Sequence, residues 1–345
     1  MTTAILTDQR FLVHDDPSHV ERAERLRAIY HALDESGLRS QALALEPRAA
    51  TPAELLAVHT QQHLDTIQRF GTHGGGYLDT DTYMVDGSWE AAVLASGGVI
   101  QAVEAVVQGI STNAFAFVRP PGHHATPTRA MGFCLINNIG VGARYALQQL
   151  GLSRVAIVDY DVHHGNGTQD IFYEDPQVLF CSTHAAPYYP GTGRLDEVGQ
   201  GAGLGATLNV PLTFGVGDKG YVQVFNEIII PALHRWKPEL LLVSAGYDAH
   251  WSDPIGPMVV SAQGFAQMTH MLANAAAELC NGRIVLVLEG GYNLNGLAAS
   301  ALASLQVLMG QNPKADDMGR INAPEPDLAA LLNHIRQRHP LFATE

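Results

Sequence analysis

Five short apolar runs constrain the fold of this chain more than any other feature of its sequence. They are residues 114–118, 154–158, 178–182, 239–245 and 283–289. Longer segments with helical periodicity lie between them, including residues 88–109, 137–151 and 220–236, with Ser88 as the predicted N-cap of the first. Apolar strands that alternate with helices indicate a mostly parallel central sheet with helices on both faces. The sequence therefore predicts an α/β fold.

A polar cluster follows each of the five apolar runs. In chain order, the clusters read RPPGHHA, DYDVHHGNG, THAAPYYPGTG, GYDAHWSDP and GGYN. In open parallel sheets, ligands bind outside the carboxyl ends of the strands, because the loops that follow the strands converge there. Five clusters at one edge of the sheet predict a functional site at that edge.

The segment VAIVDYDVHHGNG, residues 155–167, carries the clearest chemistry. If the chain stays extended beyond Val158, the two-residue period places Asp159, Asp161 and His163 on one face. Asp248, which follows another strand, supplies a further oxygen. Two carboxylates and an imidazole suit a divalent metal, either zinc or, given the oxygen donors, ferrous iron or manganese. Three protein ligands leave a position open for water or substrate, as in catalytic metal sites.

The length and composition of the chain favour a single domain. The 345 residues are 46% hydrophobic, which is ample for one large core. No linker, block of like charges or internal repeat divides the chain, and the proline-rich residues 322–327 lie too near the end to separate domains. We therefore expect one domain over residues 1–345.

The remaining composition excludes several classes of protein. The start of the chain lacks the basic and apolar regions of an export signal, and no apolar run reaches the roughly 18 residues that a membrane span needs. Cys134, Cys181 and Cys280 form no CxxC pair and no even set, which favours buried thiols in a reducing compartment. The formal charge of −14 disfavours nucleic acid. These features predict a cytoplasmic protein without nucleic-acid or membrane partners.

Taken in order, the motifs resemble those of the histone deacetylase superfamily, most closely its class II and bacterial acetylpolyamine amidohydrolase members. They are RPPGHHA, GFCLINNIG, DYDVHHGNGTQDIFY, STHAAPYYPGTG, SAGYDAHWSDP and LEGGYNL. HVERAERLRAI resembles the family's H-P-E-R-P-E-R-L segment, with Val20 and Ala23 in place of the prolines, and residues 55–67 resemble the helix that follows. The resemblance implies an arginase/deacetylase-like α/β fold.

The resemblance also implies two metal sites. One zinc ion per chain would be bound by Asp161, His163 and Asp248, with ferrous iron as the alternative in the cell. A structural potassium would be held by Asp159, the Ser182 hydroxyl and backbone carbonyls. Zinc in such a site would polarise the amide carbonyl of a substrate and lower the pKa of the attacking water.

The same resemblance makes His123 and His124 the paired catalytic histidines. Asp159 would orient His123, and Asn166 would be the partner of His124. A neutral asparagine raises the pKa of a histidine less than a carboxylate does, which favours His124 as a base at neutral pH. Tyr292, after a glycine turn, would donate its hydroxyl to the developing oxyanion.

The substrate channel is implied by the resemblance as well. Phe133 and Tyr189 would form the walls of a narrow tunnel for the acylated chain, with Gly132 and Gly291 at its floor. Ile255 stands where polyamine-selective members carry an acidic residue, so it weakens a polyamine assignment. Asp79 and Asp81 lie in the loop where the family holds the substrate backbone at the tunnel mouth.

We therefore predict a zinc-dependent amide hydrolase that removes acetyl or another short acyl group from a primary amine, such as a lysine side chain. Acetylpolyamine deacetylation is the alternative. An arginase-like binuclear manganese ureohydrolase is less favoured, because HGNG after DVH lacks the aspartate that would bridge a second metal. A catalytically silent acyl-lysine-binding module would need no proton-transfer groups. The oligomeric state stays open, with a homo-oligomer as one option.

Overall fold

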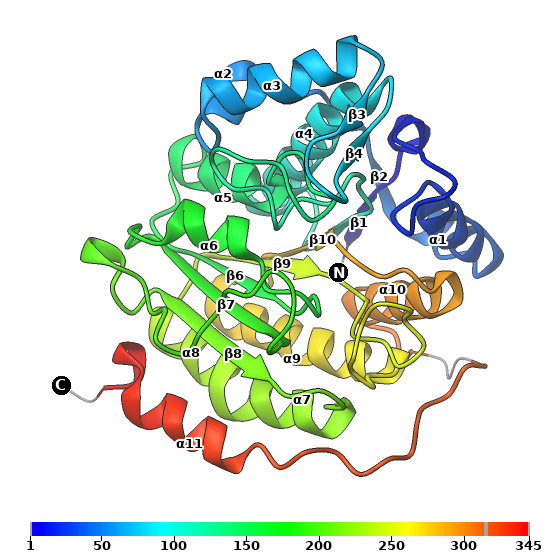
Figure 1. Ribbon diagram of the computed structural model, residues 1–345. Helices are drawn as coiled ribbons and strands as arrows, with labels where there is room; N and C mark the ends of the chain where they lie inside the picture. The colour runs from blue at the N-terminus through cyan, green and yellow to red at the C-terminus, as the bar shows by residue number, and fades with distance from the viewer. Residues whose placement is uncertain (1, 314–316, 344–345) are drawn as a thin grey trace.

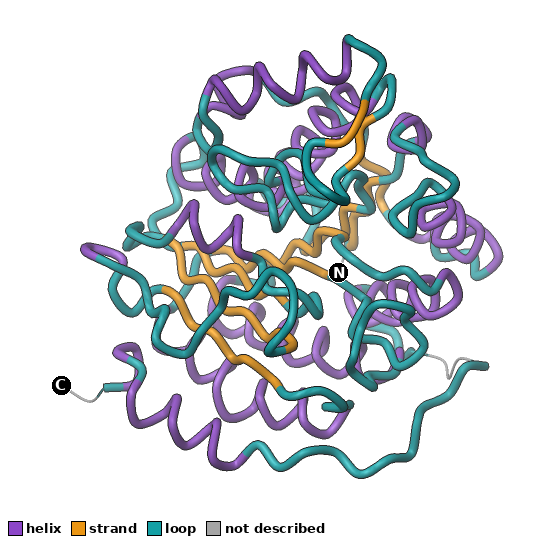
Figure 2. The backbone as a smooth tube through the Cα atoms, in the orientation of Figure 1, coloured by secondary structure: helices purple, strands orange, loops and turns teal. Residues whose placement is uncertain are grey.

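An eight-stranded sheet forms the centre of the computed structural model, which describes residues 2–313 and 317–343 (Figures 1 and 2). The strands follow the order β2-β1-β5-β10-β9-β6-β7-β8, and every pairing between neighbours is parallel. Their bounds are β1 Thr3–Leu6, β2 Leu43–Leu45, β5 Asn113–Ala116, β6 Val155–Asp159, β7 Val178–Ala185, β8 Thr207–Leu212, β9 Leu240–Ala245 and β10 Ile284–Leu288. A separate antiparallel pair joins β3 Gly76–Tyr77 to β4 Tyr83–Met84.

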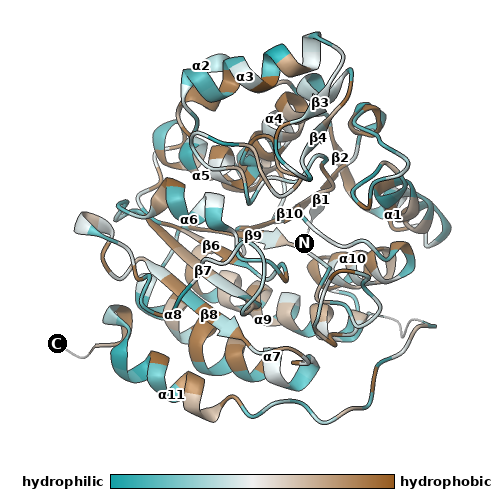
Figure 3. Cartoon of the chain, in the orientation of Figure 1, coloured by the Kyte–Doolittle hydropathy of each residue, from teal (hydrophilic) through white to brown (hydrophobic). Residues whose placement is uncertain are grey.

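Helices cover both faces of the sheet, as the continuous hydrophobicity of its strands predicts (Figures 1 and 3). On one face lie α4 Ser88–Val107, α5 Asn138–Gln148 and α6 Asn166–Phe172, with α2 Pro52–Leu56 and α3 Gln61–Thr72 packed outside them. On the other face lie α7 Asp218–Val224, α8 Ile230–Trp236, α9 Ala262–Cys280 and α10 Leu294–Leu308. Helix α1 Glu24–Glu35 packs against α10, and α11 Ala329–Arg338 lies beyond β8.

The remaining helical elements are short. A π-helical segment, Phe225–Ile229, joins α7 and α8 into one nearly continuous helix, in agreement with the helical pattern of residues 220–236. One-turn 3-10 helices occupy Gln9–Val13, Arg39–Gln41, Gly201–Gly203 and Pro340–Phe342. Cys134, Cys181 and Cys280 are buried and unpaired, as predicted.

The five predicted apolar runs form five consecutive strands at the centre of the sheet, in the order β5-β10-β9-β6-β7. Three further strands, β1, β2 and β8, were not predicted. β2 has only three residues, all of them at least partly exposed, so it carries no apolar run. β8 contains Pro211, which weakens a strand pattern but is tolerated here because β8 is an edge strand.

Two predicted helix details are wrong. Ser88 is the first residue of α4, and the N-cap is Gly87 at φ +86°. The Ser88 hydroxyl instead accepts a hydrogen bond from the Val85 amide and contacts His14. Residues 55–67 do not form one helix, because α2 ends at Leu56 and the Thr60 side chain caps a new helix, α3.

Helix α4 also corrects the expectation that no segment is long enough to span a membrane. By length and composition alone, Ser88–Val107 is long and apolar enough. However, 78% of its apolar window is buried inside the fold, where its residues pack against β1, β5 and α5. A buried core helix meets the same criterion, so α4 is weak evidence for a membrane span.

Candidate active site

The polar clusters that follow β5, β6, β9 and β10 meet at one edge of the sheet. These four strands are neighbours and parallel, so the loops that leave their carboxyl ends emerge side by side (Figure 1). The loop after β7 reaches the same place, where Tyr188 and Tyr189 contact the ring of His163. The predicted convergence is therefore present.

Asp161, His163 and Asp248 form a buried group in which one ligand atom from each lies within 4.8 Å of the others. His163 Nδ1 is 3.1 Å from Asp161 Oδ1 and 3.0 Å from Asp248 Oδ2. The other carboxylate oxygens accept hydrogen bonds from the backbone, Asp161 Oδ2 from Gly290 and Asp248 Oδ1 from Val162. These bonds aim the remaining oxygens at one point, which fits a divalent cation bound by N and O donors.

Glycine at position 290 is required by this arrangement. A Cβ atom there would lie 2.2 Å from Asp248 Oδ2 and 2.6 Å from Asp161 Oδ2. Both distances are far below van der Waals contact, so any side chain at this position would displace the two carboxylates. The first glycine of the GGYN motif therefore makes room for the metal-ligand group.

The charges around this group also favour a cation. Burial and the neighbouring Asp161 raise the pKa of Asp248 to about 7. Burial acts to lower the pKa of His163, but Asp161 and Asp248 outweigh it and raise that pKa to about 10. Both shifts show that negative charge is concentrated in a buried place. A divalent cation bound there would neutralise that charge.

His123 and His124 lie beside the group with their rings 4.0 Å apart. His123 Nδ1 is 3.0 Å from Asp159 Oδ2, and His124 Nδ1 is 2.7 Å from Asn166 Oδ1. Because an amide oxygen only accepts hydrogen bonds, His124 carries its proton on Nδ1 and keeps a lone pair on Nε2.

The two histidines differ in charge. Burial acts to lower the pKa of His123, but Asp161 and Asp159 outweigh it and raise that pKa to about 10. Burial and the nearby His123 and His163 lower the pKa of His124 well below its usual value. The pair therefore combines a cationic His123 with a neutral His124 that can accept a proton.

Tyr292 is held at the site by contacts to its backbone and ring. Its amide donates to Asp253 Oδ2 over 2.7 Å, and the guanidinium of Arg25 lies 4.9 Å from the centre of its ring. Arg25 Nε also donates to the carbonyl of Gly291 over 2.6 Å. Burial raises the pKa of Tyr292, so its hydroxyl stays protonated and can donate a hydrogen bond.

A cavity of about 600 Å³ leads from the surface to His124, His163 and Tyr292. Phe133 and Tyr189 line it. The rest of its lining is Ser18, His19, Val20, Asp79, Thr80, Asp81, Arg129, Met131, Gly132, Tyr188 and Ile255. The volume of the cavity is typical of small-molecule sites, and aromatic side chains form part of its wall.

Comparison with known proteins identifies the family. Residues 19–308 match the histone deacetylase domain. The chain belongs to the histone deacetylase family. It is 42% identical to a probable deacetylase of Archaeoglobus fulgidus, over 96% of this chain and 92% of that protein. It is also 42% identical to histone deacetylase 15 of Arabidopsis thaliana, over 91% of this chain but only 58% of that protein.

The fold comparison agrees. The crystal structure of the HDA15 HD domain matches with a TM-score of 0.89 and 39% identity, over 99% of this chain and 96% of that one. The chain is thus a deacetylase-family hydrolase that acts on amides, and the resemblance found from the motifs is confirmed. The family match argues against the arginase-like alternative.

The structure places the other predicted site residues of this deacetylase as follows. Gly132 lines the cavity, and a Cβ there would lie 2.4 Å from the His124 ring. Gly291 does not line it, because its carbonyl turns to Arg25. Ser182 lies beside Asp159 in the sheet register, and its hydroxyl contacts His184 Nδ1 at 2.9 Å. The potassium site stays a prediction.

The sequence analysis missed several residues that hold the site together. Asp253 holds the Tyr292 loop, and Glu289 Oε2 accepts hydrogen bonds from the Gly122 and His123 amides. Arg25 and Glu21 belong to the HVERAERLRAI segment, but no role was predicted for them, because charged residues at the start of a helix are ordinarily exposed. The signal that could have found them is the motif HVERAER itself, in which Glu21 and Arg25 are four positions apart, the spacing of an ion pair on one face of a helix.

Proposed function

We propose that this deacetylase is zinc-dependent and hydrolyses the amide of acetylated lysine side chains or closely related short-acyl primary amines. The observation that carries the proposal is the group of Asp161, His163 and Asp248 at the base of a cavity that also contains His124 and Tyr292. The donor set of one nitrogen and two carboxylates with an open side suits catalytic zinc. Ferrous iron would fit the same donors.

Each neighbouring residue has a defined task in this mechanism. When bound, zinc would polarise the amide carbonyl and lower the pKa of a water molecule. His124 Nε2 accepts the proton of the attacking water and returns it to the leaving amine. The Tyr292 hydroxyl donates a hydrogen bond to the oxygen that becomes negative, and the charge of His123 stabilises the same transition state.

The cavity lining favours acyl-lysine over an acetylated polyamine. Phe133 and Tyr189 offer apolar walls to an alkyl chain, and Ile255 supplies no negative charge to a second amine. Asp79 and Asp81 lie at the mouth, but Asp79 Oδ1 already accepts hydrogen bonds from the Asp81 and Thr82 amides. The exposed Asp81 contacts His19 at 3.1 Å. The carboxylates of Asp79 and Asp81 at the mouth are thus already engaged by hydrogen bonds within the loop and with His19.

The test measures acetate release by zinc-loaded protein from three substrates at equal concentration: an acetyl-lysine peptide, acetylputrescine and acetylspermidine. We expect the peptide to react fastest and chelation to abolish all turnover. Asp248→Ala is the control that removes one metal ligand. Preference for the polyamines would overturn the substrate assignment, and turnover that survives both chelation and Asp248→Ala would overturn the metal mechanism.

A further inference from the structure

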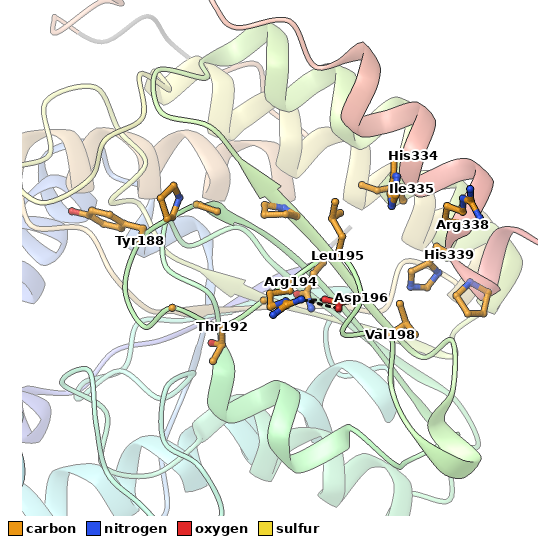
Figure 4. A pocket seen from close by; sticks show the side chains of 17 residues that line it. Tyr188, Thr192, Arg194, Leu195, Asp196, Val198, His334, Ile335, Arg338 and His339 are labelled. Atoms are coloured by element: carbon orange, nitrogen blue, oxygen red, sulfur yellow. Dashed lines mark hydrogen bonds and ion pairs between the residues drawn. The ribbon is translucent and has the colours of Figure 1, made fainter.

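A second cavity, of about 900 Å³, lies between α11 and the segment 186–198, away from the metal-ligand group (Figure 4). Its size is typical of small-molecule sites. Much of its wall is apolar, and these residues are Ala186, Pro187, Leu195, Val198, Pro211, Ile335 and Pro340. Figure 4 shows the side chains of α11 facing those of the 186–198 segment across the opening. The cavity could therefore enclose an apolar chain.

The rim of this cavity carries an unpaired positive charge. Arg194 is neutralised by Asp196, with Nε–Oδ1 and Nη2–Oδ2 distances of 3.0 and 2.9 Å. Arg338 and His334, on α11, have no hydrogen-bond or ion-pair partner within residues 2–313 and 317–343. On a chain with a formal charge of −14, a free guanidinium beside apolar walls favours an anionic head group.

The second cavity shares a wall with the tunnel. Tyr188 lines both cavities. Its ring stacks on the His163 ring at 5.4 Å, and its hydroxyl donates to the Ile255 carbonyl. A ligand that presses on the 186–198 segment from the α11 side would therefore contact the same side chain that borders the substrate.

We propose that the second cavity binds an amphipathic carboxylic acid, with its carboxylate at Arg338 and its alkyl chain against Leu195 and Ile335. The bound acid alters substrate binding in the tunnel through Tyr188. The binding part is independent of the deacetylase mechanism, whereas the coupling part rests on the proposed function. The two parts therefore need separate measurements.

Binding is measured by calorimetry with octanoate and metal-loaded protein, in the presence of a saturating hydroxamate that blocks the tunnel and its metal. We expect Arg338→Gln to weaken binding about two- to fivefold, the range for an exposed charge contact. Arg336→Gln is the matched control, because Arg336 lies on the same helix but pairs with Glu227 outside the cavity. Equal affinity of wild type and Arg338→Gln, or equal binding of octylamine, would overturn the site.

Coupling is measured as the KM for an acetyl-lysine peptide with and without octanoate. We expect a change of at least about twofold in wild type and Arg336→Gln, and a smaller one in Arg338→Gln. Direct competition of octanoate at the tunnel would affect all three proteins equally, and that result would overturn the coupling. If no variant deacetylates the peptide, the calorimetry still decides whether the cavity binds the acid.

Discussion

At the scale of single residues, the partner of each Nδ1 atom distinguishes the two adjacent histidines. His123 faces the carboxylate of Asp159, which favours the imidazolium. His124 faces the amide oxygen of Asn166, which fixes the tautomer without adding charge. Two chemically identical side chains thus acquire different protonation states from their surroundings, as expected for an acid–base pair.

Replacement of His124 by Ala removes the base but none of the metal-ligand group. We expect kcat to fall about 10²–10⁴-fold, while the metal content measured by elemental analysis stays that of wild type. Asp248→Ala should instead lose both metal and activity. A His124→Ala protein that retains more than about a tenth of the wild-type kcat would show that another group accepts the proton.

Asp253 acts on the reaction through the Tyr292 loop. Asp253 Oδ2 accepts from the amides of Tyr292 and Asn293, so Asp253→Ala should displace the phenol and lower kcat about 10–100-fold. Tyr292→Phe should lower kcat about 10²–10³-fold. Because both changes act on one hydroxyl, the double variant should be no slower than Tyr292→Phe. Additive losses in the double variant would show that Asp253 does not act through the Tyr292 hydroxyl. Asp253→Asn, which keeps an oxygen acceptor, should be faster than Asp253→Ala.

At the scale of elements, one buried carboxylate joins three segments of the chain. Glu21, before α1, accepts from Arg25 Nη1 at 3.0 Å and from Arg119 Nη2 at 2.8 Å, and Arg119 follows β5. Arg25 also donates from Nε to the carbonyl of Gly291, in the loop after β10. Burial acts to raise the pKa of Glu21, but Arg119 and Arg25 outweigh it and lower that pKa. The network therefore positions the Tyr292 loop against the start of α1.

Glu21→Gln leaves two buried guanidinium groups without their counter-charge. We expect a loss of about 3–5 kcal/mol in the free energy of unfolding, measured by urea denaturation of the metal-loaded protein. Glu24→Gln is the matched control, since Glu24 makes an exposed contact with Arg27 and should cost less than about 1 kcal/mol. Similar losses in the two variants would contradict the proposed role of the network.

At the scale of the whole molecule, several histidines are buried as neutral groups that connect distant segments. His59 Nδ1 contacts the Thr126 carbonyl at 2.9 Å, and its Nε2 accepts from the Asn137 amide at 2.9 Å. Since Nε2 is an acceptor, the ring must be neutral. Burial and the neighbouring His63 lower the pKa of His59 to about 3. The stability of the fold therefore depends on pH through a histidine that does not line the active-site cavity.

The sign of this linkage is set by the unfolded state. Between pH 6.5 and about 3, the unfolded chain protonates His59 and the folded chain does not, so stability falls as the pH falls. His59 should contribute a slope of up to about 1.4 kcal/mol per pH unit in that window and none above it. Buried acids with raised pKa values, such as Glu289, act in the opposite direction. The measurement is therefore the difference in unfolding free energy between wild type and His59→Gln as a function of pH. A difference that is constant from pH 7 to 5 would contradict the predicted linkage to His59.

Local pattern was sufficient to predict the centre of the fold and the metal-ligand residues, whereas the paired histidines and Tyr292 were predicted from the resemblance to a family. The five apolar runs became five adjacent parallel strands, because a strand buried on both faces must be apolar throughout. Asp159, Asp161 and His163 were found from their two-residue spacing. β6 ends at Asp159 and the chain bends over residues 161–163, so the extended conformation assumed for this spacing does not continue to His163, yet hydrogen bonds still join the three residues. Asp248 was found because parallel strands deliver their loops to one edge.

Only the tertiary structure decided the contacts between segments that carry no local signal. β2 and β8 are strands because of where they pair, and α4 is buried because α5 and the sheet cover it. Glu21 is neutralised in part by Arg119, 98 positions away, and Arg25 donates to the carbonyl of Gly291, 266 positions away, so their burial depends on assembly of the whole chain. The position of Tyr188 between the two cavities also depends on a distant contact, because its hydroxyl donates to the carbonyl of Ile255. The sequence by itself determined which chemistry is present, and long-range packing decided which side chains hold it in place.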